Sequence, residues 1–192
     1  FNQDISSWDT SSATDFSGMF QSAIAFNSPL DAWGAKTSDV ASMYRMFYGA
    51  ITFNQPLDSW DVGNVTSMEQ MFFGATAFSQ DLNSWRPGSV TTMAGMFHGA
   101  TSFAGDIADW TVGDVTTFLS FAENASSFNS DIGGWDTSSA TDMAKMFKGA
   151  SVFNQDLRAW DMGGVTTADQ MFTNAALALP TFAAAQDPTT RL

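Results

Sequence analysis

The feature that most constrains this chain is a tandem repeat of about 25 residues, marked by regularly spaced tryptophans. The spacing is 25 residues, except for one interval of 27, and the tryptophans are Trp8, Trp33, Trp60, Trp85, Trp110, Trp135 and Trp160. The two extra residues fall in the second copy, within the segment GAKTSD. Self-similarity at such a period indicates a solenoid, in which each copy forms one coil that packs against its neighbours.

The copies approximate FNQDLSxWDVGxVTxMxxMFxGAxx and predict a single solenoid domain over residues 1–177. The predicted repeats are residues 1–25, 26–52, 53–77, 78–102, 103–127, 128–152 and 153–177. Residues 178–192 break the pattern and are interpreted as a C-terminal partial cap or a linker. One copy alone buries too little apolar surface to offset the cost of ordering it, so we expect stability only from stacking.

Each copy is predicted to contain a short strand followed by a short helix. In the third copy, the leucine-rich pattern LxxLxLxxN falls on Leu57, Trp60, Val62 and Val65, with Val65 in the position of the asparagine. The spacing i, i+3, i+4, i+7, which is typical of one helix face, falls on Met68, Met71, Phe72 and Ala75. The predicted fold class is therefore α/β: a right-handed, leucine-rich-repeat-like solenoid of seven strand–helix coils, with a parallel β-sheet on one face.

Composition excludes several classes of function. The net charge of -13 disfavours nucleic acid as a partner, because a polyanion would be repelled. The chain has no cysteine and no apolar run long enough for a transmembrane segment. The regularly placed Trp, Phe and Met residues could form a sugar platform or a copper site, but their repeated positions favour packing in the core.

The outward positions of the predicted strands are the candidate ligand-binding face. Alternation along each strand turns the residues on either side of the tryptophan away from the core. The candidates are Asp9, Asp61, Arg86, Asp109, Asp136 and Asp161. Their acidity would suit a basic protein patch or a cation, whereas the alternative is a merely solvated face.

Two further sets of residues could carry a ligand or a modification. A second acidic ladder, Asp81, Asp106, Asp131 and Asp156, could coordinate calcium between neighbouring coils, or could simply be solvated and cap turn amides. Calcium is the one cofactor that the sequence suggests, and the alternative is that no cofactor is bound. Asn64 and Asn124 begin sequons that would permit glycosylation in a eukaryotic secretory pathway.

The sequence offers few residues that could form a catalytic site. The single histidine, His98, occupies a variable position, and no copy supplies a partner base at a distinctive spacing. Nearly identical copies also single out no pair of carboxylates. We therefore expect a protein that is not an enzyme.

The segments FNQDISSWDTSSATDFSGMF and FNQPLDSWDVGNVTSMEQMF resemble the surface-lipoprotein repeat family related to BspA-type leucine-rich repeats. The resemblance covers residues 1 to about 177 and implies an extracellular or cell-surface protein. It also implies adhesion, meaning recognition of a protein or glycan partner by a repeat scaffold. The alternative function is a structural tile that self-associates into a fibre, coat or envelope layer.

Overall fold

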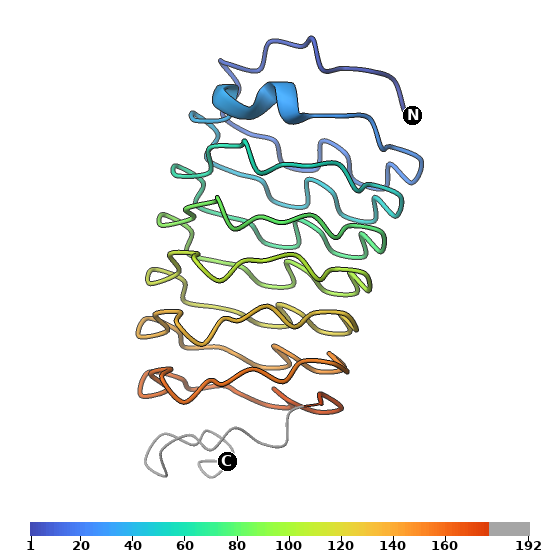
Figure 1. The fold of residues 1–192 in the computed structure, drawn as a ribbon. Helices are drawn as coiled ribbons and strands as arrows, with labels where there is room; N and C mark the ends of the chain where they lie inside the picture. The colour runs from blue at the N-terminus through green and yellow to red at the C-terminus, as the bar shows by residue number, and fades with distance from the viewer. Residues whose placement is uncertain (177–192) are drawn as a thin grey trace.

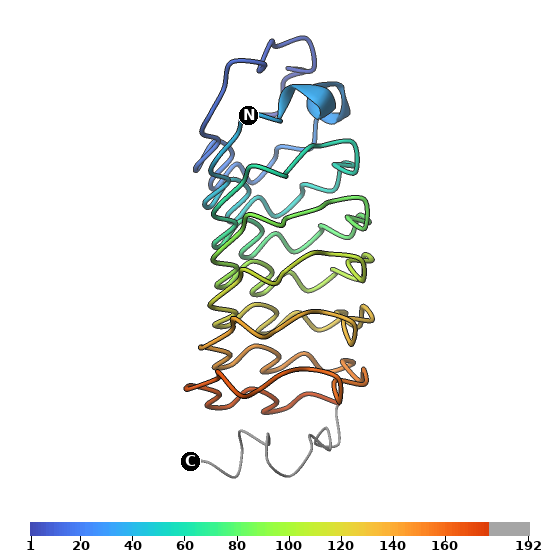
Figure 2. The ribbon, with the colours of Figure 1, turned by 90° about the vertical axis from the view of Figure 1, so that its left-hand side faces the viewer.

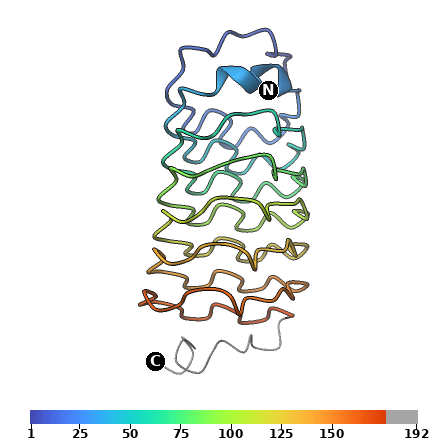
Figure 3. The ribbon, with the colours of Figure 1, turned by 60° about the vertical axis from the view of Figure 1, so that its left-hand side comes forward.

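The computed structural model describes residues 1–176, which form a stack of coils that follows the copies of the repeat. Successive coils lie one above the other along a single axis, with the first copy at one end and the last at the other (Figures 1 and 2). Each coil is a flattened loop with two long sides, as an intermediate view also shows (Figure 3), and the buried apolar side chains of the coils form one core. The predicted cap or linker at 178–192 lies outside the described residues.

Regular secondary structure is nearly absent from these coils. Within residues 1–176, the one regular element is the 3-10 helix η1, Asp31–Lys36, which lies at the insertion in the second copy. Neighbouring coils are joined by isolated parallel bridges, at Asp15–Ser42, Ser42–Ser67, Ser67–Thr92, Thr92–Thr117, Thr117–Asp142 and Asp142–Thr167. The prediction of an α/β leucine-rich-repeat solenoid with a parallel sheet is therefore wrong.

The predicted helix is instead a run of overlapping turns, which we call the turn segment; in the second coil it spans residues 43–50. Some amides close a turn, as Met46 N does by donating to Met43 O at 3.2 Å. The amides between them donate to the next coil, as Arg45 N does to Glu69 O at 3.0 Å. An α-helix would bond all of these amides locally. Here alternate amides join the coils.

Left-handed residues explain why no helix forms. Each turn segment has two positions with positive φ, for example 54° at Arg45 and 66° at Gly49 in the second coil. A left-handed residue interrupts the right-handed helical path. The i, i+3, i+4, i+7 spacing correctly indicated a buried face. Successive turns, each closed between residues three apart, also place these positions on one side. That spacing alone does not distinguish such turns from a helix.

The predicted strand is also a pair of turns. In the third coil, Trp60 N donates to Leu57 O and Val65 N donates to Val62 O, each at 3.1 Å. Tryptophan side chains add bonds between coils here, because from the second coil on each indole Nε1 donates to a backbone carbonyl of the preceding coil. The six bonds measure 2.8–3.2 Å and join Trp33 to Ile5, Trp60 to Leu30, Trp85 to Leu57, Trp110 to Leu82, Trp135 to Ile107 and Trp160 to Ile132.

The core consists of side-chain ladders that run along the stack. Equivalent rings stack from coil to coil, as Phe53 and Phe78 do with centroids 6.0 Å apart and Trp85 and Trp110 do at the same distance. Most of the Trp, Phe and Met side chains are buried, which confirms their interpretation as core residues. Trp8, in the first coil, is an exception with 51% of its surface exposed.

An amide ladder near the start of each copy adds further bonds between coils. Asn54 N donates to Asn27 Oδ1 at 2.8 Å, and Asn154 N donates to Asn129 Oδ1 at 2.9 Å. The asparagine of the consensus FNQ therefore has a structural role. Its side chain accepts a hydrogen bond from a backbone amide of the next coil, which has no partner from a sheet.

Candidate functional site

The predicted acidic face consists of exposed residues, but it lies on turns rather than on strands. Four of its carboxylates accept a bond from the amide two residues ahead, as Asp61 does from Gly63 N at 3.0 Å and Asp161 does from Gly163 N at 2.7 Å. The others behave in the same way, Asp9 toward Ser11 and Asp136 toward Ser138. These carboxylates stabilise the turn after each tryptophan, and a ligand-binding role for them stays a prediction.

The two remaining members of that face have different partners. Arg86 donates to the carbonyls of Asn83 and Trp85 at 2.7 and 2.8 Å. Asp109, which precedes its tryptophan, accepts from the side chain of Asn83 at 3.2 Å. The structure therefore does not bring all six predicted residues into one column.

The predicted calcium ladder also makes bonds within the protein. Asp81 Oδ1 accepts from Asp106 N at 2.9 Å, and Asp106 Oδ1 accepts from Ala108 N at 3.0 Å. Among residues 1–176, no three His, Cys, Asp or Glu side chains are grouped so that they could hold a metal ion. Both carboxylates already accept hydrogen bonds from backbone amides, and calcium binding stays a prediction.

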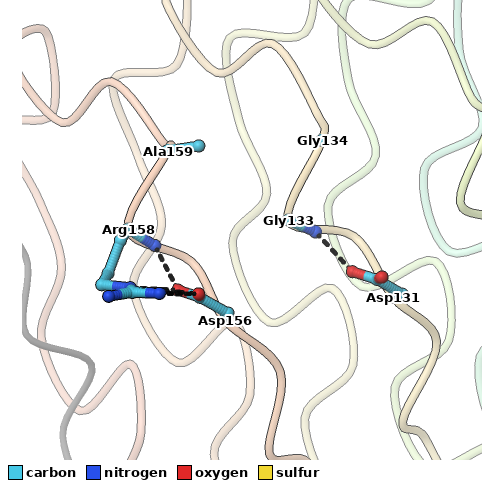
Figure 4. A pocket seen from close by; sticks show the side chains of 6 residues that line it. All are labelled: Asp131, Gly133, Gly134, Asp156, Arg158 and Ala159. Atoms are coloured by element: carbon cyan, nitrogen blue, oxygen red, sulfur yellow. Dashed lines mark hydrogen bonds and ion pairs between the residues drawn. The ribbon is translucent and has the colours of Figure 1, made fainter.

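The lower half of this ladder borders an open pocket of about 520 Å³ (Figure 4). Asp131 accepts from Gly133 N at 3.2 Å, while Asp156 is held by the guanidinium of Arg158 (Figure 4). The hydrogen bond from Arg158 lowers the pKa of Asp156 to about 2. Because Asp156 and Arg158 pair with each other, neither is free to bind a ligand without giving up that pair.

Both predicted glycosylation sites lie at exposed positions. The side chain of Asn64 donates to Ser38 O at 2.8 Å, and Asn124 has a positive φ of 61° in its turn segment. The structure describes these positions but does not test modification.

A different surface stands out, which we call the turn ridge. It consists of the three variable positions of the turn segment in coils two to six. The positions are Tyr44, Arg45 and Tyr48; Glu69, Gln70 and Phe73; Ala94, Gly95 and His98; Leu119, Ser120 and Glu123; and Ala144, Lys145 and Lys148. The ridge holds both tyrosines, both glutamates and the single histidine of the whole chain. The consensus of the repeat does not reveal this surface, because these positions differ from copy to copy. Tabulating the rare residue types by repeat position would have found it.

Half-buried rings stack along this ridge. The rings of Tyr48 and Phe73 lie 4.7 Å apart, and those of Phe73 and His98 lie 4.3 Å apart, each pair nearly parallel. The row continues into an ion pair, because Lys148 Nζ lies 3.4 Å from Glu123 Oε1, and His98 Nδ1 lies 3.6 Å from Glu123 Oε2. The ridge is therefore a row of different side chains that are fixed by contacts with one another.

Arg45 is fixed at the upper end of the ridge. Its guanidinium lies over the rings of Tyr44 and Tyr48, 4.9 and 5.3 Å from their centroids. Its Nε donates to Gln70 Oε1 at 2.6 Å. These contacts hold the long side chain in one place and reduce the entropy that binding would cost.

Burial sets the protonation of His98, and hydrogen bonds and neighbouring charges set that of Glu123. Burial lowers the pKa of His98 below 6.5, even though Glu123 opposes the shift, and Lys145 and Lys148 lower it further. For Glu123, burial raises the pKa, but the hydrogen bond from Ser120, His98 and Lys148 together lower it below 4.5. His98 is therefore neutral and Glu123 ionised near pH 7.

The lowered pKa of His98 predicts a loss of stability between about pH 7 and pH 5. The contribution of His98 to the free energy of unfolding is complete above its pKa in the unfolded chain. It is lost at lower pH, because the histidine binds a proton more tightly in the unfolded chain than in the folded one. Glu123, whose pKa is also lowered, changes the stability in the same direction at lower pH. Replacing His98 with glutamine, which Gln21 shows at the equivalent position, should reduce the difference between urea midpoints at the two pH values. An unchanged difference in this variant would contradict the assignment to His98.

A hollow of about 260 Å³ lies at the centre of the turn ridge. Ala94 and Gly95 are the small residues along it, and Phe73, His98 and Leu119 also line it. Glu69, Gln70 and Ser120 supply its polar groups. The hollow exists because coil four carries small residues where the neighbouring coils carry larger ones.

Stacked, turn-built coils around an apolar core, with one surface of unlike side chains, define a tandem-repeat solenoid scaffold. The chain belongs to the family described as Mycoplasma protein of unknown function, DUF285, which matches residues 1–85, 34–133 and 74–181. The overlapping matches agree with a repeat protein and do not confirm the more specific resemblance to BspA-type repeats. No curated protein and no solved structure matches the chain significantly. The function of the family is unknown, so the absence of enzymatic activity stays a prediction.

Proposed function

We propose that the chain is a non-enzymatic recognition scaffold, acting outside the cell, that binds a protein partner through the turn ridge. The observation that supports this proposal is the concentration of the chain's Tyr, Glu and His residues on one surface of an otherwise repetitive molecule. The core positions are occupied by the same residue types in most coils and serve stacking, whereas these side chains differ from coil to coil. The extracellular location comes from the sequence resemblance and is part of the proposal.

The composition of the ridge favours a protein partner over a glycan. Aromatic residues and arginine are enriched in protein interfaces and dominate their binding energy. The parallel stacking of Tyr48, Phe73 and His98 covers the ring faces and leaves the edges outward, while sugars stack on open ring faces. The rings are also held before binding, so that little side-chain entropy is lost.

The charge of the chain favours a basic partner. The net charge of -13 would attract a positively charged surface and speed its encounter with the scaffold.

Within residues 1–176, no helix is both long and apolar enough to cross a membrane.

The test uses a ridge variant that combines Tyr44→Ala, Tyr48→Gln and Phe73→Thr. Each new residue occurs at the equivalent position of another coil, so the turn geometry is retained. Peptides selected from a random displayed library on the wild-type chain should bind the ridge variant at least about tenfold more weakly, as expected when hot-spot side chains are removed. Circular dichroism and thermal unfolding check that the variant is folded.

The matched control changes the acidic face instead, by Asp61→Thr, Asp136→Thr and Asp161→Thr. Threonine occupies the equivalent position in the fifth coil, at Thr111. The selected peptides should bind this control as they bind the wild type. Loss of binding in the control and not in the ridge variant would move the recognition surface to the acidic face.

A further inference from the structure

We infer that the hollow in the turn ridge receives a basic side chain, an arginine or lysine that projects from the partner. This inference rests on the proposed function, because it names the chemistry that the same ridge recognises.

The size of the hollow fits one side chain. Its volume of about 260 Å³ lies below the range of about 300–1,000 Å³ typical of small-molecule pockets. Gly95 keeps it open: a Cβ on Gly95 would come within 3.2 Å of Gln70 Cγ and 3.6 Å of the Phe73 ring. A side chain at that position would therefore stand in the space that the partner's side chain is proposed to fill.

The lining suits a long side chain with an apolar stem. Phe73 and Leu119 offer apolar contact, and Ala94 adds a methyl group. Lysine and arginine bury their methylene stems against such surfaces while the charged end reaches a polar group. An uncharged aliphatic side chain would gain the first contact and not the second.

The carboxylate of Glu69 supplies the charge. It lines the hollow and makes no hydrogen bond or ion pair with any residue in the 1–176 range. The other glutamate of the ridge, Glu123, is already held by Ser120 and Lys148. Glu69 is thus the free anion of the ridge, and a carboxylate suits a guanidinium or an ammonium group.

Two cations of the ridge, Arg45 and Lys148, are already engaged within the chain. Arg45 packs on Tyr44 and Tyr48 and donates to Gln70, and Lys148 pairs with Glu123. His98 faces Glu123, Lys145 and Lys148, and burial lowers its pKa, so it is neutral near pH 7 and does not repel an incoming cation. Glu69 is left for a group that comes from outside the chain.

The experiment is an NMR titration of the isotope-labelled chain with Nα-acetyl-arginine methylamide at millimolar concentrations, followed at the amides of Gly95 and Ser120. The uncharged control probe is Nα-acetyl-norleucine methylamide, which keeps the stem and lacks the charge. We expect the arginine probe to bind more tightly than the norleucine probe, with the largest shifts at the hollow. Equal binding of the two probes would overturn the inference.

Two variants locate the contact. Glu69→Gln, which removes no bond of the folded chain, should weaken the arginine probe about fivefold, the size expected of an exposed ion pair, and leave the norleucine probe unchanged. Gly95→Ser should weaken both probes by filling the hollow, and serine is compatible with the positive φ because Ser120 adopts it. The matched control, Gly18→Ser, changes the equivalent left-handed glycine of the first coil and should have no effect.

The outcome separates this inference from the proposed function. If Glu69→Gln binds the arginine probe like the wild type, the basic pocket is refuted. If peptides selected on the wild type still fail to bind the ridge variant in that case, the ridge remains the recognition surface. If the peptides bind the ridge variant normally, the proposed function itself is refuted.

Discussion

Replacing Trp110 with alanine is expected to lower the free energy of unfolding by about 4 kcal/mol, which is typical of a buried tryptophan. Only 3% of Trp110 is exposed, and its ring stacks between Trp85 and Trp135 at 6.0 and 6.2 Å. Its Nε1 also donates to Leu82 O in the preceding coil at 2.8 Å. The substitution therefore leaves a cavity and removes one of the bonds between coils.

The matched control for this prediction is Trp8→Ala. Trp8 occupies the same repeat position, but it is 51% exposed and stacks on one neighbour only, Trp33. Urea unfolding followed by circular dichroism should show a small loss for Trp8→Ala and a large one for Trp110→Ala. Equal losses would contradict the account in which buried indoles join the coils.

Replacing Thr37 with valine is expected to cost about 2 kcal/mol, because it leaves the part-buried backbone N–H and C=O of Asp61 without their partner. Thr37 is fully buried; its hydroxyl lies 2.9 Å from both Gly34 O and Asp61 O and accepts from Asp61 N at 2.8 Å. Valine keeps the shape and already occupies this repeat position at Val62. The loss therefore reports the hydrogen bonds rather than the packing.

Thr10 provides the control at the same repeat position of the first coil. Its hydroxyl is buried and has no hydrogen-bond partner, so Thr10→Val removes an unsatisfied group and should leave the free energy of unfolding unchanged or raise it. Thermal and urea unfolding of both variants measure the difference. If Thr10→Val destabilised the chain as much as Thr37→Val, the assignment to the bonds with Asp61 would fail.

The repeat and its core could be predicted from the sequence because they depend on regular spacing. Trp, Phe and Met recur at fixed positions, and burial at those positions follows from stacking. The backbone could not be predicted in the same way. Arg45, Gln70, Ser120 and Lys145 are left-handed, although their residue types do not favour that conformation, because bonds to the next coil impose it. The hydrogen bonds of the indoles could not be predicted either, since the sequence does not show which carbonyl a buried tryptophan bonds to.

The candidate sites show a similar division. The acidic residues after the tryptophans were found by their repetition, and repetition is what a structural role produces, as the bond from Gly63 N to Asp61 shows. The turn ridge departs from the repeat, and its residues come together only through stacking of the coils. Phe73 and His98 are 25 residues apart in the chain and 4.3 Å apart between ring centroids. Pattern matching along the chain therefore found the scaffold and missed the ridge.

Photo-crosslinking tests the role of the turn ridge most directly. A benzophenone amino acid placed at Tyr48 on the ridge, or at Asp61 on the acidic face, reports which surface lies against a peptide selected on the wild-type chain. The account predicts crosslinked peptide from position 48 and none from position 61. Crosslinking from position 61 alone would show that the partner binds elsewhere and would contradict the assignment of the ridge as the recognition surface.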